Sequence, residues 1–257
     1  MNKSGIKLGL AASTLSLMTF APSAEAAGLN LRGDLLDTFF GYVQNEGQAF
    51  DELALPQLDA ANLFWDGVDP VEVFFIDEGA GFKNQLLYSV NDQPLEMIFD
   101  NVSSTQSTLS DWDGALDLGE GRNLGTFDGP TQLSFFTRAN GFNGGTNLFG
   151  ANEYTSTTVE GETVNGDGLT HLIAYEYFDD VEQETYTIIG FEDLWGEKGA
   201  TGGRNQNSDR DFNDVVFAVK GLTEGAPEEV PEPSMLLGML GVAALGAKGA
   251  KRKLTAA

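Results

Sequence analysis

The side chains best suited to chemistry in this 257-residue chain are acidic, and they lie in two short segments. The first segment holds two adjacent acids, and the second follows a Gly-rich stretch. Oxygen atoms are the ligands that Ca²⁺ prefers, and the ion takes about six to eight of them. We therefore expect Ca²⁺ as a cofactor, held by Glu192, Asp193, Asp209, Asp211, Asn213 and Asp214.

The second segment has the spacing that a looped site needs. Alternate residues of extended backbone share a side, so Asp209, Asp211 and Asn213 can converge while Phe212 points to the core. It is not an EF-hand loop, because Asp214 stands where that loop has its turn glycine. The alternative that stays open is that these Asp and Asn residues only cap turns.

Charge repulsion favours a counter-ion at such a cluster. Two like charges 4 Å apart cost roughly 4 kcal/mol at an effective dielectric of about 20. The five carboxylates outnumber the two arginines of the region, Arg204 and Arg210. A bound divalent cation or raised carboxylate pKa values must therefore absorb the excess negative charge.

Two further polar residues lie outside this pattern. Glu78 precedes Gly79 and Gly81, and we interpret it as a surface glutamate at a turn, with a place in the cluster as the alternative. His171 begins an apolar segment, which favours a hydrogen-bonded strand-end residue over a catalytic or metal-binding one. We predict no catalytic residue.

Short apolar stretches must position these residues. They are rich in β-branched and aromatic side chains, are of strand length, and are separated by Gly, Asn and Asp. They occupy residues 71–77, 85–90, 95–102, 132–138, 170–178, 185–191 and 215–219. We predict an all-β, antiparallel β-sandwich or jelly-roll-like domain, with long loops at 113–122, 140–168 and 196–206. Residues 34–44 fit a helix or an edge strand equally well.

Composition excludes several classes of protein. The chain has no cysteine and one histidine, which excludes thiol catalysis, iron–sulfur clusters and multi-histidine metal centres. Residues 1–26 and 234–257, which are predicted to be removed, contain six of the 14 Lys and Arg residues but only one of the 39 Asp and Glu residues. This leaves 8 basic against 38 acidic residues, a net charge of −30. Such a surface attracts cations and repels nucleic acid, so no nucleic-acid partner is expected.

The first 26 residues have the layout of a secretory signal peptide. Lys3 and Lys7 give a cationic start, residues 8–20 are mostly apolar, and Ala24 and Ala26 form a small-x-small cleavage site. We expect cleavage after Ala26 and export through the general secretion machinery.

The last residues predict a membrane-inserting tail. A Pro-Glu linker at 222–234 contains Pro231, Glu232 and Pro233, and an uncharged run and a basic cluster follow within 235–257. The run is short for a transmembrane helix, which needs ~20 apolar residues. The basic cluster acts as a cytoplasmic stop and consists of Lys251, Arg252 and Lys253.

This order of Pro-Glu-Pro-Ser, apolar run and basic end resembles the PEP-CTERM sorting signal of Gram-negative bacteria. The resemblance implies transient inner-membrane anchoring and cleavage near the motif by an exosortase-like protease. It further implies that the processed protein is attached to the outer surface or released.

A second resemblance covers the part between the two signals. Gly-Phe-Glu-Asp-Leu at 190–194 and Asp-Arg-Asp-Phe-Asn-Asp-Val-Val-Phe at 209–217 resemble the signature of the domain of unknown function 4114 family. The similarity would span 65–221, after an N-terminal extension at 27–64. It implies an all-β secreted module and adds weight to Asp211, Asn213 and Asp214 as a site. Trp195 and the Gly-rich stretch after it depart from the tight connection that usually joins the two acidic segments in this family.

We expect an exported, non-enzymatic cell-surface or extracellular-matrix protein. The nearest alternative is a module that binds matrix exopolysaccharide through Trp65, Trp112 and Trp195. A secreted hydrolase ranks behind both, because the chain has no Gly-x-Ser-x-Gly nucleophile elbow and no phosphate loop.

Overall fold

The computed structural model describes residues 28–43 and 55–225, which form an all-β domain of antiparallel sheets. The predicted signal peptide at 1–26 with Ala24 and Ala26, the sorting motif at 231–233, and the apolar and basic tail at 235–257 lie outside these residues. Among the described helices, none has the length and apolar character that a membrane crossing requires.

All seven predicted strands are present. They differ from the expected ranges by no more than two residues at either end. They are β4 (Val71–Asp77), β5 (Asn84–Val90), β6 (Glu96–Val102), β8 (Leu133–Ala139), β12 (Leu172–Asp179), β13 (Glu184–Phe191) and β16 (Val215–Lys220).

Several short strands lie where loops or linkers were predicted. β7 (Glu120–Gly125) overlaps the predicted loop 113–122; its sequence has few strand-forming residues, but it pairs with β4 on one side and β1 (Leu29–Asn30) on the other. The predicted loop 140–168 also contains short elements. They are η2 (Gly141–Asn143), β9 (Asn147–Gly150), η3 (Asn152–Tyr154), β10 (Thr158–Val159) and β11 (Glu162–Thr163).

The predicted linker also begins with a strand. β17 (Leu222–Glu224) pairs with β3 (Leu63–Trp65), so the linker prediction for 222–224 is wrong. Trp65 of β3 is buried, and its indole nitrogen donates a hydrogen bond of 2.6 Å to the carbonyl oxygen of Asp69. The pairing joins the end of the domain to residues before β4.

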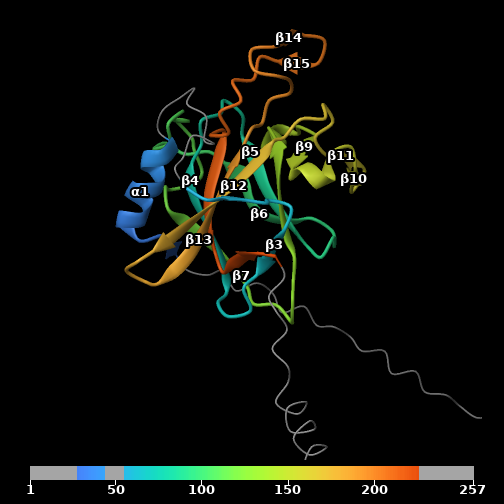
Figure 1. Ribbon diagram of the computed structural model, residues 1–257. Coiled ribbons are helices and arrows are strands. Elements are labelled where there is room, and N and C mark those ends of the chain that lie inside the picture. The colour runs from blue at the N-terminus through green and yellow to red at the C-terminus, as the bar shows by residue number, and fades with distance from the viewer. Residues whose placement is uncertain (1–27, 44–54, 226–257) are drawn as a thin grey trace, which may run out of the picture.

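Two large antiparallel sheets form the body of the domain (Figure 1). The seven-stranded sheet has the order β1-β7-β4-β16-β13-β12-β2, where β2 is Gln57–Leu58, and the four-stranded sheet has the order β6-β5-β8-β9. The predicted loop 196–206 carries a small hairpin of β14 (Thr201–Gly202) and β15 (Asn205–Gln206), which lies at one end of the domain in Figure 1.

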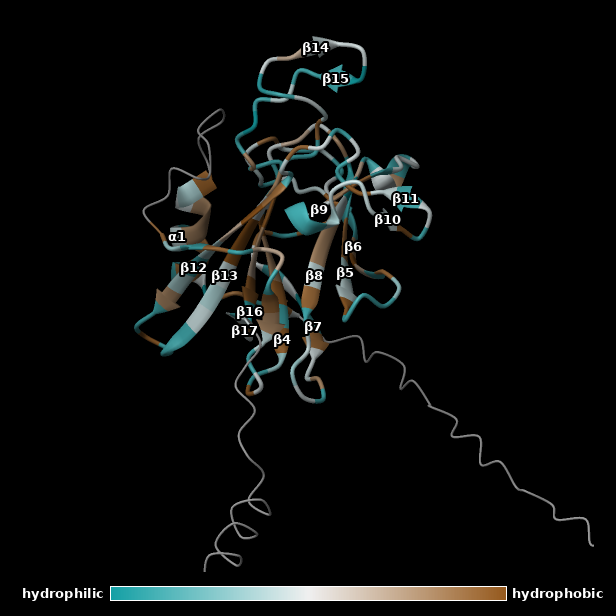
Figure 2. Cartoon of the chain, turned by 45° about the vertical axis from the view of Figure 1, so that its right-hand side comes forward, coloured by the Kyte–Doolittle hydropathy of each residue, from teal (hydrophilic) through white to brown (hydrophobic). Residues whose placement is uncertain are grey.

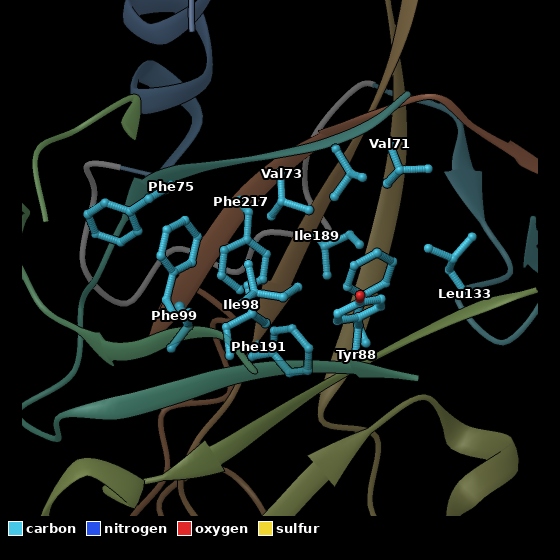
Figure 3. Close-up of a cluster of buried hydrophobic side chains, with 14 of the residues drawn as sticks. Val71, Val73, Phe75, Tyr88, Ile98, Phe99, Leu133, Ile189, Phe191 and Phe217 are labelled. Atoms are coloured by element: carbon cyan, nitrogen blue, oxygen red, sulfur yellow. The ribbon is translucent and has the colours of Figure 1, made fainter. Parts of the chain in front are cut away.

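The main core lies between these two sheets. Phe75, Ile189 and Phe217 from the larger sheet pack in one cluster with Tyr88 and Phe99 from the smaller one (Figure 3). Successive side chains of a strand point to opposite faces of the sheet, so every second residue faces this core. Figure 2 shows the hydrophobic strands inside and hydrophilic loops outside. This face-to-face packing is that of a β-sandwich.

A helix covers the other face of the seven-stranded sheet. α1 (Gly33–Val43) settles the open assignment of residues 34–44 and buries Leu35, Phe39 and Val43. These side chains pack against Phe74 and Ile188, whose strand neighbours face the main core. The larger sheet is therefore buried on both faces, which makes it a rigid base for residues at its strand ends.

Candidate metal centre

Neighbouring strands of the larger sheet bring the two acidic segments together. β13 ends at Phe191, which pairs with Val215 at the start of β16. Glu192 therefore leaves the sheet at the point where Asp214 enters it. The Asp193 backbone N–H donates a 2.7 Å hydrogen bond to Oδ2 of Asp214, which joins the two segments directly.

Five of the six predicted ligands are brought together in two groups of carboxylates. Within each group, one carboxylate oxygen from every residue lies within 4.8 Å of the others. One group is Glu192, Asp193 and Asp214, and the other is Glu192, Asp209 and Asp211. All of these residues are buried except Asp209, which is half-buried.

The sixth predicted residue, Asn213, lies at the edge of the cluster. Its carbonyl oxygen accepts a 3.1 Å hydrogen bond from the Gly79 backbone N–H, and its N–H donates to Oδ1 of Asp211. Its side-chain nitrogen is buried and has no hydrogen-bond partner among the described residues. Asn213 thus ties the loop that begins at Gly79 to the acidic segment.

The chain reaches this arrangement through left-handed backbone rather than extended backbone. Arg210 has φ = 52° and Phe212 has φ = 61°, a region that non-glycine residues seldom occupy. Phe212 is buried in the hydrophobic cluster between α1 and the larger sheet, which agrees with the prediction that it points to the core. Asp209 and Asp211 approach Glu192 instead. Left-handed turns at alternate residues therefore gather the acids on one side.

One carboxylate oxygen in the middle of the cluster is left without a partner. Oε1 of Glu192 accepts a 3.3 Å hydrogen bond from the Leu194 N–H, but Oε2 is buried and has none among the described residues. In contrast, Oδ2 of Asp193 accepts a 2.6 Å hydrogen bond from the Asn84 amide. A buried carboxylate oxygen without a donor is costly unless a cation fills the gap.

The electrostatic surroundings disfavour ionised acids in the absence of a cation. Burial raises the pKa of Asp193 to about 7, assisted by the charge of Glu192 and opposed by the Asn84 hydrogen bond. Burial also raises the pKa of Glu192, which the Ser208 hydroxyl and the Arg210 charge lower in part, and it raises that of Asp214.

The two arginines of the region make contacts outside the carboxylate groups. The guanidinium carbon of Arg204 lies 3.5 Å from the centre of the Trp195 ring. Arg210 donates a hydrogen bond to the carbonyl oxygen of Thr170. Its charge still acts on Glu192, but a single guanidinium cannot balance the acids around it.

Glu78 is buried near this cluster but in neither carboxylate group, so its interpretation as a surface residue is wrong. Only 1% of the residue is exposed. Burial raises its pKa to about 9, with a contribution from the charge of Asp193. Its neighbour Asp77 is also buried and accepts hydrogen bonds of 2.8 and 2.6 Å from the N–H and hydroxyl of Thr108. The pairing of β4 with β16 brings both acids here, and this pairing is not visible in the sequence.

A cavity of about 320 Å³ connects the cluster with solvent. Its wall includes Asp193, Asp209 and Asp214 together with the loop 79–82. The cavity provides an entry path for a cation and room for water molecules.

His171 supports the backbone of the site, as predicted for a hydrogen-bonded strand-end residue. Nδ1 lies 2.9 Å from the carbonyl oxygen of Glu192, and Nε2 lies 3.0 Å from Oδ1 of Asp167. The ring stacks on Phe149 with centroids 4.0 Å apart. Burial alone would raise the pKa of Asp167, but hydrogen bonds from His171 and the Gly196 N–H lower it below its usual value.

Comparison with known protein families identifies two parts of the chain. Residues 127–222 match the family described as Domain of unknown function (DUF4114), and residues 229–253 match the PEP-CTERM protein-sorting motif. The first match contains all six predicted metal ligands and begins after β7, so it covers the second half of the predicted range 65–221. No curated protein and no solved structure matches the chain.

Each match covers one part of the chain, and the DUF4114 match covers 96 of the 257 residues. The chain carries a DUF4114 domain followed by a PEP-CTERM sorting signal, as the sequence predicted. The sorting motif is generally associated with exosortase processing and implies export.

Proposed function

We propose that this is an exported, non-enzymatic component of the cell surface or extracellular matrix whose DUF4114 domain is stabilised by bound Ca²⁺. The observation that carries the proposal is Glu192, whose buried Oε2 atom has no hydrogen-bond partner among the described residues. The same side chain is common to both groups of carboxylates. A hard cation at this position would supply the missing partner and offset the repulsion.

Calcium suits the site better than other biological metals. The ligands offered are carboxylate oxygens, which select hard cations over copper or zinc. The left-handed turns and the open cavity favour the irregular coordination of Ca²⁺ over the strict octahedron of Mg²⁺. The sorting-motif match supports export, and a calcium-stabilised module can be used outside the cytoplasm.

Thermal unfolding with Ca²⁺ and with a chelator tests the proposal. A ligand that binds only the folded state stabilises it by about 2.7 kcal/mol at a hundredfold excess over Kd. We expect Ca²⁺ to raise the midpoint of the wild-type protein. Glu192→Gln should remove most of this increase while leaving the chelated protein folded, because the amide keeps the shape and removes a repelling charge.

The matched control is Asp180→Asn, which removes one acid from the exposed turn between β12 and β13. It should retain the full Ca²⁺ effect. A wild-type midpoint that is the same with Ca²⁺ and chelator would contradict the calcium proposal. An equal loss in both variants would assign the effect to general surface charge.

An exposed tryptophan favours a carbohydrate-binding module as the second candidate. Trp112 is 87% exposed, whereas Trp65 and Trp195 are buried. It lies between Asp111 and Asp113, which Lys83 holds at 3.2 and 2.6 Å. A polysaccharide that binds the wild-type protein and not Trp112→Ala would support this candidate, since aromatic rings stack on sugar faces.

A further inference from the structure

We propose that the acidic cluster holds two divalent cations, with the carboxylate of Glu192 bridging them. This inference deepens the calcium site proposed above and rests on it. One ion would lie among Glu192, Asp193 and Asp214, and the other among Glu192, Asp209 and Asp211.

The geometry of the carboxylates favours two positions over one. Oxygens bound to one Ca²⁺ at about 2.3–2.6 Å lie at most about 5 Å apart. Each group of three meets this limit, because its ligand atoms lie within 4.8 Å of one another. Glu192 is the residue that the two groups share, and a carboxylate has two oxygens with which to serve two ions.

The unpartnered oxygen of Glu192 is an independent indication. Glu192 is fully buried, and its Oε2 atom has no hydrogen-bond donor among the described residues. Oε1 accepts a long hydrogen bond, of 3.3 Å, from the Leu194 N–H, and the Ser208 hydroxyl also bonds to this carboxylate. Oε2 therefore retains lone pairs for metal ions.

Charge balance leads to the same number of ions. Five carboxylates with one guanidinium, that of Arg210, carry a formal charge of −4. One divalent cation would leave −2 in a largely buried site, and two would balance the charge. Since like charges repel strongly at low effective dielectric, occupancy of both positions is favoured.

The two positions differ in their access to solvent. Asp193 and Asp214 are buried, whereas Asp209 is half-buried. Asp193, Asp209 and Asp214 all line the cavity of about 320 Å³, which has room for the water ligands that three carboxylates leave unfilled. We expect the ion near Asp214 to bind more tightly and the ion near Asp209 to exchange more readily.

Calcium stoichiometry tests the inference on the full exported protein. Equilibrium dialysis against Ca²⁺ with elemental analysis should give two ions per wild-type chain. The double variant Asp209→Asn with Asp211→Asn should retain one ion, and Glu192→Gln should weaken both sites by about tenfold or more. Asp180→Asn should still bind two ions.

The outcomes separate this inference from the proposal on which it rests. One ion per wild-type chain would overturn the bridged pair and leave the calcium site intact. No bound ion would overturn both. Unchanged stoichiometry in the double variant would exclude Asp209 and Asp211 as ligands, and the wild-type measurement decides the number of ions even if a variant fails to fold.

Discussion

At the scale of single residues, close backbone approach at Gly79 shapes the site. A Cβ atom on Gly79 would lie 2.5 Å from the side-chain oxygen of Asn213 and 3.1 Å from its carbonyl oxygen. Real Cβ atoms do not tolerate the shorter distance. Glycine therefore lets the loop 79–82 line the cavity beside the acids.

Replacement of Gly79 by alanine should displace Asn213. We expect a loss of about 1–3 kcal/mol in unfolding free energy, the usual cost of forcing extra atoms into a packed site, and a weaker Ca²⁺ effect. Chemical denaturation with and without Ca²⁺ measures both. The control is Gly81→Ala, because a Cβ atom there meets nothing within 4 Å. Equal losses in the two variants would show that the contact with Asn213 is unimportant.

At the scale of elements, an ion-pair network joins the start of α1 to the turn after β12. The Arg32 guanidinium lies 2.9 Å from carboxylate oxygens of both Asp179 and Glu182. The hydrogen bond from Arg32 is the main cause that lowers the pKa of Asp179 to about 2. The contact holds the helix against the strands whose far ends carry the acids.

This pairing predicts a specific acid dependence of stability. Because the folded-state pKa of Asp179 is depressed, its contribution is present above the ordinary Asp pKa and is lost as the pH falls toward 2. Arg32→Met should therefore destabilise the domain at pH 6, with a smaller difference from wild type near pH 2. Denaturant midpoints measured between these values test this, with Lys198→Met as an exposed control. A difference that does not change with pH would argue against the pair.

The sequence predicts some of these elements well, for physical reasons. β4, β13 and β16 are rich in β-branched or aromatic residues, and they are buried on both faces. α1 was ambiguous because Leu35, Phe39 and Val43 share a face in a helix and also in a strand. β7 has the sequence Glu-Gly-Arg-Asn-Leu-Gly, and its pairing with β4 and β1, rather than its own propensity, makes it a strand.

The candidate site, like the fold, was predictable from the sequence only in part. Acid spacing alone pointed to the five carboxylates that the structure brings together. The burial of Glu78 and the contact of Gly79 with Asn213 were not predictable, because both depend on the pairing of β4 with β16. Contacts between residues that are distant in the sequence leave no recognisable pattern in the local sequence.

At the scale of the whole molecule, export predicts two processing events. The sorting motif match at 229–253 supports cleavage near Pro231–Pro233, and the signal-peptide layout predicts a mature start after Ala26. Replacing Pro231, Glu232 and Pro233 by alanine should leave a heavier, membrane-retained protein, whereas Pro227→Ala, outside the matched motif, should be processed normally. Intact mass of the surface or released fraction measures this. Normal processing of the triple variant would contradict the role of the motif.

The direction of β16 gives the domain a polarity. The strand starts beside Asp214 and ends at Lys220, roughly 20 Å away, where β17 joins β3 at the other end of the domain (Figure 1). The described residues finish at 225, directly after β17 and shortly before the matched sorting motif in the sequence. The proposed metal site and the end of the described chain thus lie at opposite ends of the domain. If Ca²⁺ binds at the proposed site of the exported protein, the Ca²⁺ concentration of the external medium would set the stability of that end of the domain.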